Sequence, residues 1–268
     1  MAFALWETGP SRRAVYHTES NSDGAFEFRA VAEGEWRLHA ESENRDMILV
    51  ADEWIVVTGR DLEGVTARLA APFTLNGRVM LETPEGAPAV RPPNVVLVRQ
   101  HDGRMLFDDQ ALFTGEPDAG GRFHVDGLYP GVYMVQPDEP PPGYYLDAIQ
   151  NGQTRGWDEL ELAAGSAELV LIYKSYGGRL RGTVGNCGSG QVLLVAQDAP
   201  RFARAVDCDA WGHFQMDAIR PGEYSAVAVR GPDLGPRRVD AVLLQAASRV
   251  TIRAGETTQL DLTVSSVR

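Results

Sequence analysis

"GRFHVDGLYPGVY", residues 121–133, has two ungapped counterparts in the chain, "GAFEFRAVAEGEW" (24–36) and "GHFQMDAIRPGEY" (212–224). Each copy has a glycine, a phenylalanine two positions later, a second glycine, and an aromatic residue two positions after that glycine. The copies begin 97 and 91 residues apart. A period of that length indicates one domain per copy, because solenoid repeats span only about 20–50 residues.

The shared positions suit the corners of a β-hairpin. The first glycine can supply the positive φ that a tight turn needs, and the phenylalanine then begins a strand. "LYPG" and "IRPG" form a second turn, which the first copy builds as "AEG" without proline, and the aromatic residue after it opens the next strand and fills the core. The motif therefore predicts a fold rather than a catalytic centre, through Gly24, Phe26, Gly34, Trp36, Gly121, Phe123, Gly131, Tyr133, Gly212, Phe214, Gly222 and Tyr224.

Composition and charge argue against several classes of protein and of partner. Of the 268 residues, 44% are hydrophobic, which is ordinary for a folded chain and too high for a disordered one. The net charge of −12 argues against nucleic acid or an anionic membrane as the main partner. No stretch approaches the roughly 18 apolar residues of a membrane span. The start, "MAFALWETGPSRR", has no basic region before its apolar run and is not a secretory signal.

Short β-branched or leucine-rich runs separated by Gly, Pro, Asp and Asn clusters predict an all-β chain. We expect three domains, at residues 1–70, 71–174 and 175–268, and call these segments the first, second and third repeat. Each complete repeat is expected to be a seven-stranded antiparallel β-sandwich. In the third repeat the expected strands are 178–185, 191–197, 203–208, 212–217, 223–230, 239–245 and 258–265.

The first repeat is predicted to be incomplete. "LNGRV" (75–79) opens the second repeat and "LRGTV" (180–184) opens the third, but the 23 residues before Gly24 leave room only for strands near 3–6 and 13–18. Residues 60–70, "RDLEGVTARLA", take the place of its final strand. A sandwich without its first strand exposes an edge. We expect the chain to continue a longer protein, or another segment to fill the gap, with strand addition at the open edge as one alternative.

The hairpin motif resembles the carboxypeptidase regulatory-like domain, which is similar in fold to transthyretin (prealbumin), to B-type repeats of collagen adhesins and to starch-binding-like sandwiches. "AGGRFHVDGLYPGVYMV" followed by "PPGYYLDAIQNGQ" is especially similar to tandem copies in bacterial envelope proteins. The resemblance implies a transthyretin-like, Ig-like Greek key and a structural or interaction module without catalytic activity. It also implies a cell-envelope or extracellular location, although this chain shows no signal peptide.

No residue pattern indicates catalysis, a metal site or a cofactor. The five histidines are scattered, no HExxH or CxxC motif occurs, and there is no GxSxG nucleophile elbow. Cys187 and Cys208 fall at the ends of two expected strands of the third repeat. In an oxidising compartment they could form a disulfide, and two independent buried thiols are the alternative.

Three function classes stay open. The first is a non-enzymatic structural or adhesion segment of a bacterial envelope or secreted protein, with an unidentified protein or polysaccharide partner. The second is a carbohydrate-binding module, for which exposed aromatic rings would stack on sugars, with Tyr144, Tyr145 and Trp157 as candidates and Trp54 and Trp211 as further ones. The third is an accessory domain of a peptidase or outer-membrane receptor whose catalytic or barrel part is not in this chain.

Overall fold

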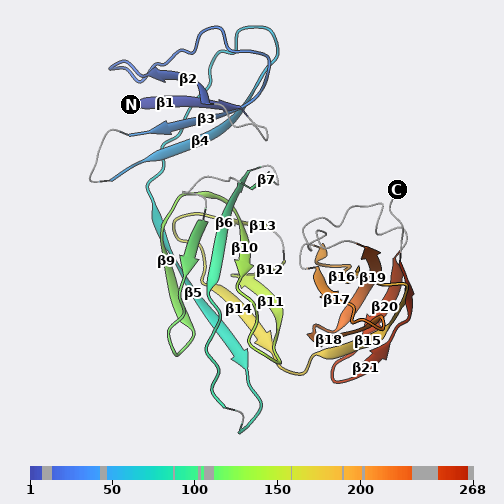
Figure 1. Ribbon diagram of the computed structural model, residues 1–268. Helices are drawn as coiled ribbons and strands as arrows, with labels where there is room; N and C mark the ends of the chain where they lie inside the picture. The colour runs from blue at the N-terminus through green and yellow to red at the C-terminus, as the bar shows by residue number, and fades with distance from the viewer. Residues whose placement is uncertain are drawn as a thin grey trace. The chain divides into compact units, whose positions relative to one another are not determined.

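The computed structural model describes residues 1–7, 14–42, 47–86, 88–101, 104–105, 112–157, 159–188, 190–200, 203–230 and 247–264. The chain is all-β, and no α-helix occurs in these ranges (Figure 1). None of the described residues belongs to a helix that could cross a membrane. Two compact units are present: one contains Met1–Leu75 with Val125–Val132 and Glu161–Ser166, and the other contains the remainder. The three-domain boundaries therefore stay a prediction.

The first repeat forms one antiparallel sheet, in the order β2-β1-β3-β4. Its inward side chains include Phe3, Leu5, Trp36 and Leu38, each at most 4% exposed. The expected strands near 3–6 and 13–18 correspond to two of its members. The strands are β1 (Ala2–Glu7), β2 (Ala14–Glu19), β3 (Gly34–Glu41) and β4 (Val50–Val57).

The second repeat forms two sheets. One has the path β13-β10-β6-β7 with β8 also paired to β6, and the other has the order β12-β11-β14-β5-β9. Alternation along β5, where Leu75, Gly77 and Val79 are buried and their neighbours exposed, places one face of this strand on the core. The strands are β5 (Phe73–Glu82), β6 (Val95–His101), β7 (Arg104–Met105), β8 (Leu112–Gly115), β9 (Arg122–Leu128), β10 (Gly131–Pro137), β11 (Tyr145–Asn151), β12 (Thr154–Gly156), β13 (Glu159–Leu162) and β14 (Leu169–Lys174).

The third repeat also forms two sheets, β17-β16-β19-β20 and β18-β15-β21 with β22 paired to β15. Its core contains Leu180, Val192, Leu194 and Ala226, all at most 1% exposed. The expected strand at 239–245 lies outside the described residues. The strands are β15 (Gly178–Gly185), β16 (Gly190–Ala196), β17 (Arg204–Asp207), β18 (His213–Ile219), β19 (Gly222–Arg230), β20 (Ser248–Ile252), β21 (Thr257–Gln259) and β22 (Leu262–Thr263).

The same four-stranded arrangement occurs in all three repeats. The order β2-β1-β3-β4 of the first repeat corresponds to β8-β6-β10-β13 in the second and to β17-β16-β19-β20 in the third. The second sheet of each complete repeat contains the opening strand, β5 or β15, between the hairpin strand and the closing strand. In the first repeat, no strand among the described residues occupies this second layer.

Three expectations about strands need correction. Pairing is not antiparallel throughout, because β5 runs parallel to β14 and β15 runs parallel to β21 and β22. In the first repeat, Phe26 does not begin a strand, and residues 60–70 form no closing strand beyond a single bridge between Val50 and Ala70. Both segments correspond to neighbours of an opening strand, and a strand exists only where a backbone partner is present.

Candidate functional site

In each copy of the hairpin, the side chain three residues before the first glycine accepts hydrogen bonds from backbone amides and forms the turn. Asn21 Oδ1 accepts hydrogen bonds from the amides of Asp23 and Ala25, at 3.0 and 2.9 Å. Asp118 Oδ1 accepts from Gly120 and Arg122 at 2.8 and 2.9 Å. The third copy repeats this pattern, with Asp209 Oδ1 accepting from Trp211 at 2.9 Å and His213 at 2.7 Å. These are Asx turns, which the sequence analysis missed although Asn or Asp stands at this position in all three copies.

The second glycine and its aromatic partner also form a repeated unit. Gly34 and Gly222 have φ of 148° and 157°, and a Cβ at either would lie 3.7 Å from the aromatic ring two residues later. Trp36 Nε1 donates to the carbonyl of Ala32 at 2.9 Å, and Tyr224 Oη donates to the carbonyl of Arg220 at 2.6 Å. In both cases the side chain bonds a backbone carbonyl four residues earlier and so closes the turn that precedes its own strand. The motif residues therefore serve the fold.

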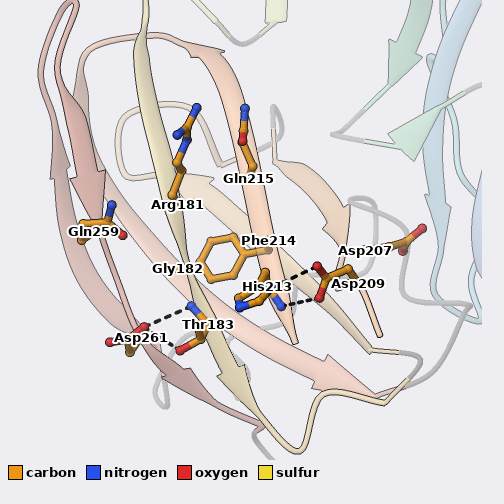
Figure 2. A pocket seen from close by; sticks show the side chains of 10 residues that line it. All are labelled: Arg181, Gly182, Thr183, Asp207, Asp209, His213, Phe214, Gln215, Gln259 and Asp261. Carbon is orange, nitrogen blue, oxygen red and sulfur yellow. Dashed lines mark hydrogen bonds and ion pairs between the residues drawn. The ribbon is translucent and has the colours of Figure 1, made fainter. Parts of the chain in front are cut away.

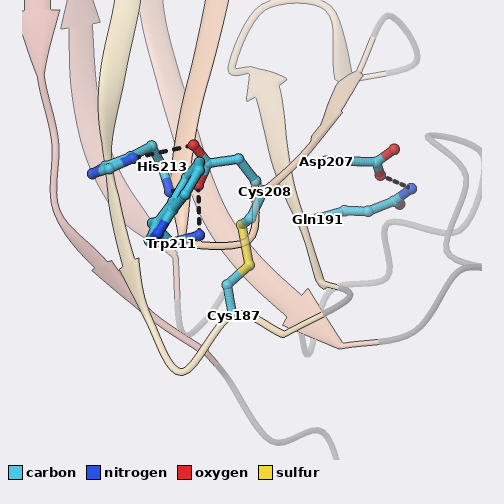
Figure 3. The surroundings of a disulfide bond; sticks show 7 residues. Cys187, Gln191, Asp207, Cys208, Trp211 and His213 are labelled. Atoms are coloured by element: carbon cyan, nitrogen blue, oxygen red, sulfur yellow. Dashed lines mark hydrogen bonds and ion pairs between the residues drawn. A yellow bond between two sulfur atoms is a disulfide. The ribbon is translucent and has the colours of Figure 1, made fainter.

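Cys187 and Cys208 are joined by a disulfide in the third repeat, with their Cα atoms 6.4 Å apart (Figure 3). Cys187 is 2% exposed and belongs to the core, and Cys208 packs against that core from one end of β17. The bond links the loop before β16 to the segment that leads into the Asx turn of Asp209. It therefore fixes the base of the third hairpin, a link that neither of the other copies has, since these are the chain's two cysteines.

A hollow lies on the outer face of the β18-β15-β21 sheet (Figure 2). It measures about 530 Å³, and Gly182 and the buried residue Phe214 are among the residues that line it. Polar side chains from neighbouring strands surround it, since Thr183 pairs with His213 and Arg181 pairs with Gln215. The lining residues are Arg181, Gly182, Thr183, Asp207, Asp209, His213, Phe214, Gln215, Gln259 and Asp261.

Two carboxylates at this hollow are held in the charged form. Asp261 Oδ1 accepts from the hydroxyl and the amide of Thr183 at 2.7 and 3.1 Å, which lowers its pKa. Desolvation raises the pKa of Asp209, but hydrogen bonds from the amide and ring of His213 and from the amide of Trp211 outweigh it, so the net direction is downward. Both groups are at the surface, so they can contact polar ligands but are not poised for proton transfer near neutral pH.

The aromatic residues expected to bind sugar differ in exposure. Tyr144 and Tyr145 are 7% and 8% exposed, and the Tyr144 hydroxyl lies 2.9 Å from Thr83 Oγ1. Trp157 is half-buried with the Arg220 guanidinium 4.5 Å from its ring centroid. These three rings therefore offer little free face for stacking. Trp211, in contrast, is 80% exposed beside the Asx turn of the third repeat.

Among the described residues, no group of three or more His, Cys, Asp or Glu side chains is arranged to hold a metal ion. His39 has two close carboxylates, since it lies 2.8 Å from Asp52 and 3.0 Å from Glu41. Burial alone would lower its pKa, but the two carboxylates raise it overall. Arg37 also binds Asp52 at 2.8 Å, so this cluster is an ion-pair network between β3 and β4.

No family model matches the sequence. No curated protein is similar to it either, so the carboxypeptidase regulatory-like resemblance stays a prediction.

Solved structures similar to the chain include a Streptococcal ancillary pilin, with 11% identity and a TM-score of 0.28 over 99% of this chain and 92% of that one. The minor pilin GBS52 of Streptococcus agalactiae has 13% identity and a TM-score of 0.31, over 73% of this chain and 98% of that one. The major pilin subunit BcpA of Bacillus cereus has 12% identity and a TM-score of 0.26, over 98% and 93%. At TM-scores this low the likenesses carry no argument.

Proposed function

We propose that the chain is a non-enzymatic structural or adhesion segment of a bacterial cell-envelope or secreted protein. Repetition is the observation that carries this proposal. The same Asx turn is built three times from Asn21, Asp118 and Asp209, with the same pair of amide donors two and four residues later. Repeating one sandwich extends a chain and multiplies its surface, whereas catalysis needs a single converged site.

The disulfide supports the location. Cys187 and Cys208 are both bonded, and disulfides persist mainly in oxidising compartments such as the cell surface and the extracellular space. The hollow on the third repeat lies on the open face of a sheet, so it suits surface contact better than enclosure of a substrate.

Thiol trapping in the bacterium that produces the protein tests the location. Cells are quenched in acid, free thiols are alkylated with a maleimide reagent, and the mass of the chain is measured before and after reduction. We expect no label before reduction and two labels after it. An antibody against the chain should also bind intact cells. Two free thiols together with antibody binding only after lysis would contradict the proposal.

Carbohydrate binding is a second candidate, favoured by Trp211. This ring is 80% exposed and stands two residues before His213, whose side chain lines the polar hollow. An exposed ring beside polar groups is the arrangement that sugar stacking needs. A glycan array with the intact chain tests it, using Trp211→Ala against Tyr176→Ala, which removes another ring that is 68% exposed. Loss of binding only with Trp211→Ala supports this candidate, and equal binding by all three chains contradicts it.

A further inference from the structure

The opening strand of a complete repeat is held between two neighbours. In the second repeat, β5 lies between β9 and β14, and it pairs with β14 in parallel with Gly77 opposite Leu169. In the third, β15 lies between β18 and the closing strands β21 and β22. The backbone of the opening strand also bonds the hairpin glycine, since the amide of Val79 donates to Gly121 at 2.7 Å and that of Val184 donates to Gly212 at 2.8 Å.

The first repeat has both neighbours without the strand between them. Residues 24–29 follow the Asx turn of Asn21, and residues 61–69 lead to the bridge at Ala70. Both segments are fully described, and neither forms a backbone ladder with the other or with any described strand. In the second of them Val65, Ala67 and Leu69 are half-buried against the core while Thr66 and Arg68 are exposed, which is the alternation of a strand.

Side-chain burial shows which part of the first repeat is uncovered. Phe26 is only half-buried against Phe3, whereas its counterparts Phe123 and Phe214 are 5% and 4% exposed. Trp36, which lies on the complete sheet, is 4% exposed like its counterparts. The hairpin residue next to the vacant strand position is therefore less buried than its counterparts in the complete repeats, whereas the residue on the complete sheet is equally buried.

The first glycine of each hairpin motif indicates the same vacant strand position. A Cβ on Gly121 would lie 2.1 Å from the Val79 carbonyl oxygen, and one on Gly212 would lie 2.6 Å from that of Val184. A Cβ on Gly24 would have nothing within 4 Å. Gly24 has the same φ as its counterparts, at 81° against 79° and 83°, so its backbone is already shaped for the close approach of a strand.

We propose that the first repeat binds one extended strand donated by a partner polypeptide, inserted between residues 24–29 and 61–69. The strand has the pattern Leu-x-Gly-x-Val found in "LNGRV" and "LRGTV". Glycine is needed at its centre because a Cβ at Gly77 would lie 2.0 Å from the Phe123 ring, and Phe26 is the matching ring here. A second copy of this chain is a poor donor, since its own two such strands are paired on both sides. Strand addition of this kind supplies both backbone hydrogen bonds and side-chain burial.

A peptide with the sequence of residues 73–82 tests the proposal on the intact chain. We expect saturable binding of one peptide per chain, measured by fluorescence anisotropy. Amide hydrogen exchange should slow in residues 24–31 and 61–70 and stay unchanged in the second and third repeats, whose positions are filled. The same peptide carrying Gly77→Val should bind about tenfold more weakly or worse, which corresponds to about 1.4 kcal/mol.

A substitution in the chain gives the matched control. Gly24→Ala places a methyl group in open space in the free chain but against the carbonyl of an incoming strand, so it should weaken peptide binding by about tenfold without unfolding the repeat. Gly86→Ala imposes the same backbone strain, at φ 80° with nothing within 4 Å, in the second repeat and should leave binding unchanged.

Several results would overturn the proposal: no binding of the peptide, equal binding of the Gly77→Val peptide, or protection outside residues 24–31 and 61–70. A concentration-dependent dimer that protects the same residues without peptide would also overturn it, in favour of pairing between copies. The test uses purified protein, so its outcome does not depend on where the chain is located in the cell.

Discussion

The first and second repeats share a hairpin motif but differ in what touches it. Gly24 and Gly121 have nearly the same φ, at 81° and 79°, yet only Gly121 is pressed against another strand. Phe28 is half-buried while its counterpart Val125 is 2% exposed, and Val31 is half-buried while Leu128 is fully buried. The turn therefore forms from local hydrogen bonds alone, whereas the strand that follows it requires a neighbour.

This difference separates two roles that the motif combines. Asn21 and Asp118 each satisfy two amides within four residues, so the turn does not depend on distant parts of the chain. The glycine, in contrast, meets a packing partner only when an opening strand lies beside it, and the phenylalanine is fully buried only in that case. Substitutions at matched positions can measure the two roles separately.

The largest expected effect is that of Gly121→Ala. The new Cβ would lie 2.1 Å from the carbonyl oxygen of Val79, and φ of 79° adds backbone strain. We expect the free energy of unfolding of the second repeat to fall by about 3 kcal/mol. Gly24→Ala carries only the backbone strain and should cost about 1 kcal/mol. Urea denaturation with hydrogen exchange to assign each transition measures both, and equal losses would contradict the comparison.

Reduction of the disulfide is expected to have an effect of comparable size. The bond closes a loop between residues separated by 21 positions, which corresponds to about 3 kcal/mol of stabilisation. Reductant should therefore lower the thermal midpoint of the third repeat and leave the transitions of the first and second repeats in place. A chain with both Cys187→Ala and Cys208→Ala is the control and should not respond to reductant. A general shift of all transitions would show that the bond does not act locally.

The sequence was sufficient for the parts of the fold that depend on local chemistry. The turns at Gly24, Gly121 and Gly212 and the buried aromatic residues after the second turn follow from spacing alone. The hairpin arm of the first repeat was predicted as a strand because Phe26 alternates correctly, but pattern does not reveal whether a backbone partner exists.

The candidate site could be predicted less well. Tyr144 and Tyr145 stand beside "PPG" in a segment that reads as an exposed loop, yet both are buried, and the Tyr144 hydroxyl contacts Thr83, which is distant in sequence. Trp211 follows an equally polar stretch and is 80% exposed. The sequence pattern predicts on which face of a strand a side chain lies. The burial of that side chain depends on which elements pack against the face.

Alanine residues in left-handed backbone conformations give a smaller effect. Ala30, Gly127 and Ala218 are equivalent positions six residues after the first glycine, with φ of 55°, 74° and 51°. Left-handed backbone costs an alanine about 1 kcal/mol, and greater freedom of glycine in the unfolded chain offsets part of this. Ala30→Gly and Ala218→Gly should therefore each stabilise their repeat by about 0.5 kcal/mol.

Gly127→Ala is the reverse change and should destabilise the second repeat by about the same amount or slightly more, because its Cβ would meet nothing within 4 Å and strain acts alone. Thermal midpoints of the three variants measure the effect. If all three shifted in the same direction, backbone strain would not be the cause.

The smallest effect is the pH dependence of the third Asx turn. The folded-state pKa of Asp209 lies below its ordinary value, so its charged form stabilises the fold above the ordinary aspartate pKa of about 3.9. That contribution is lost as pH falls through the lowered folded-state pKa. Asp209→Asn keeps the acceptor for the amides of Trp211 and His213, as Asn21 does in the first repeat, but does not titrate.

Thermal midpoints of the third repeat, measured from neutral pH to well below that value, test the Asp209 contribution. The native chain should be the more stable of the two at neutral pH, and the gap between the midpoints should close in acid. Asp261 also has a lowered pKa but is present in both chains, so its titration cancels in the comparison. A gap that stays constant with pH would show that the turn depends on the geometry of the acceptor alone, which would make the three copies equivalent despite their different side chains.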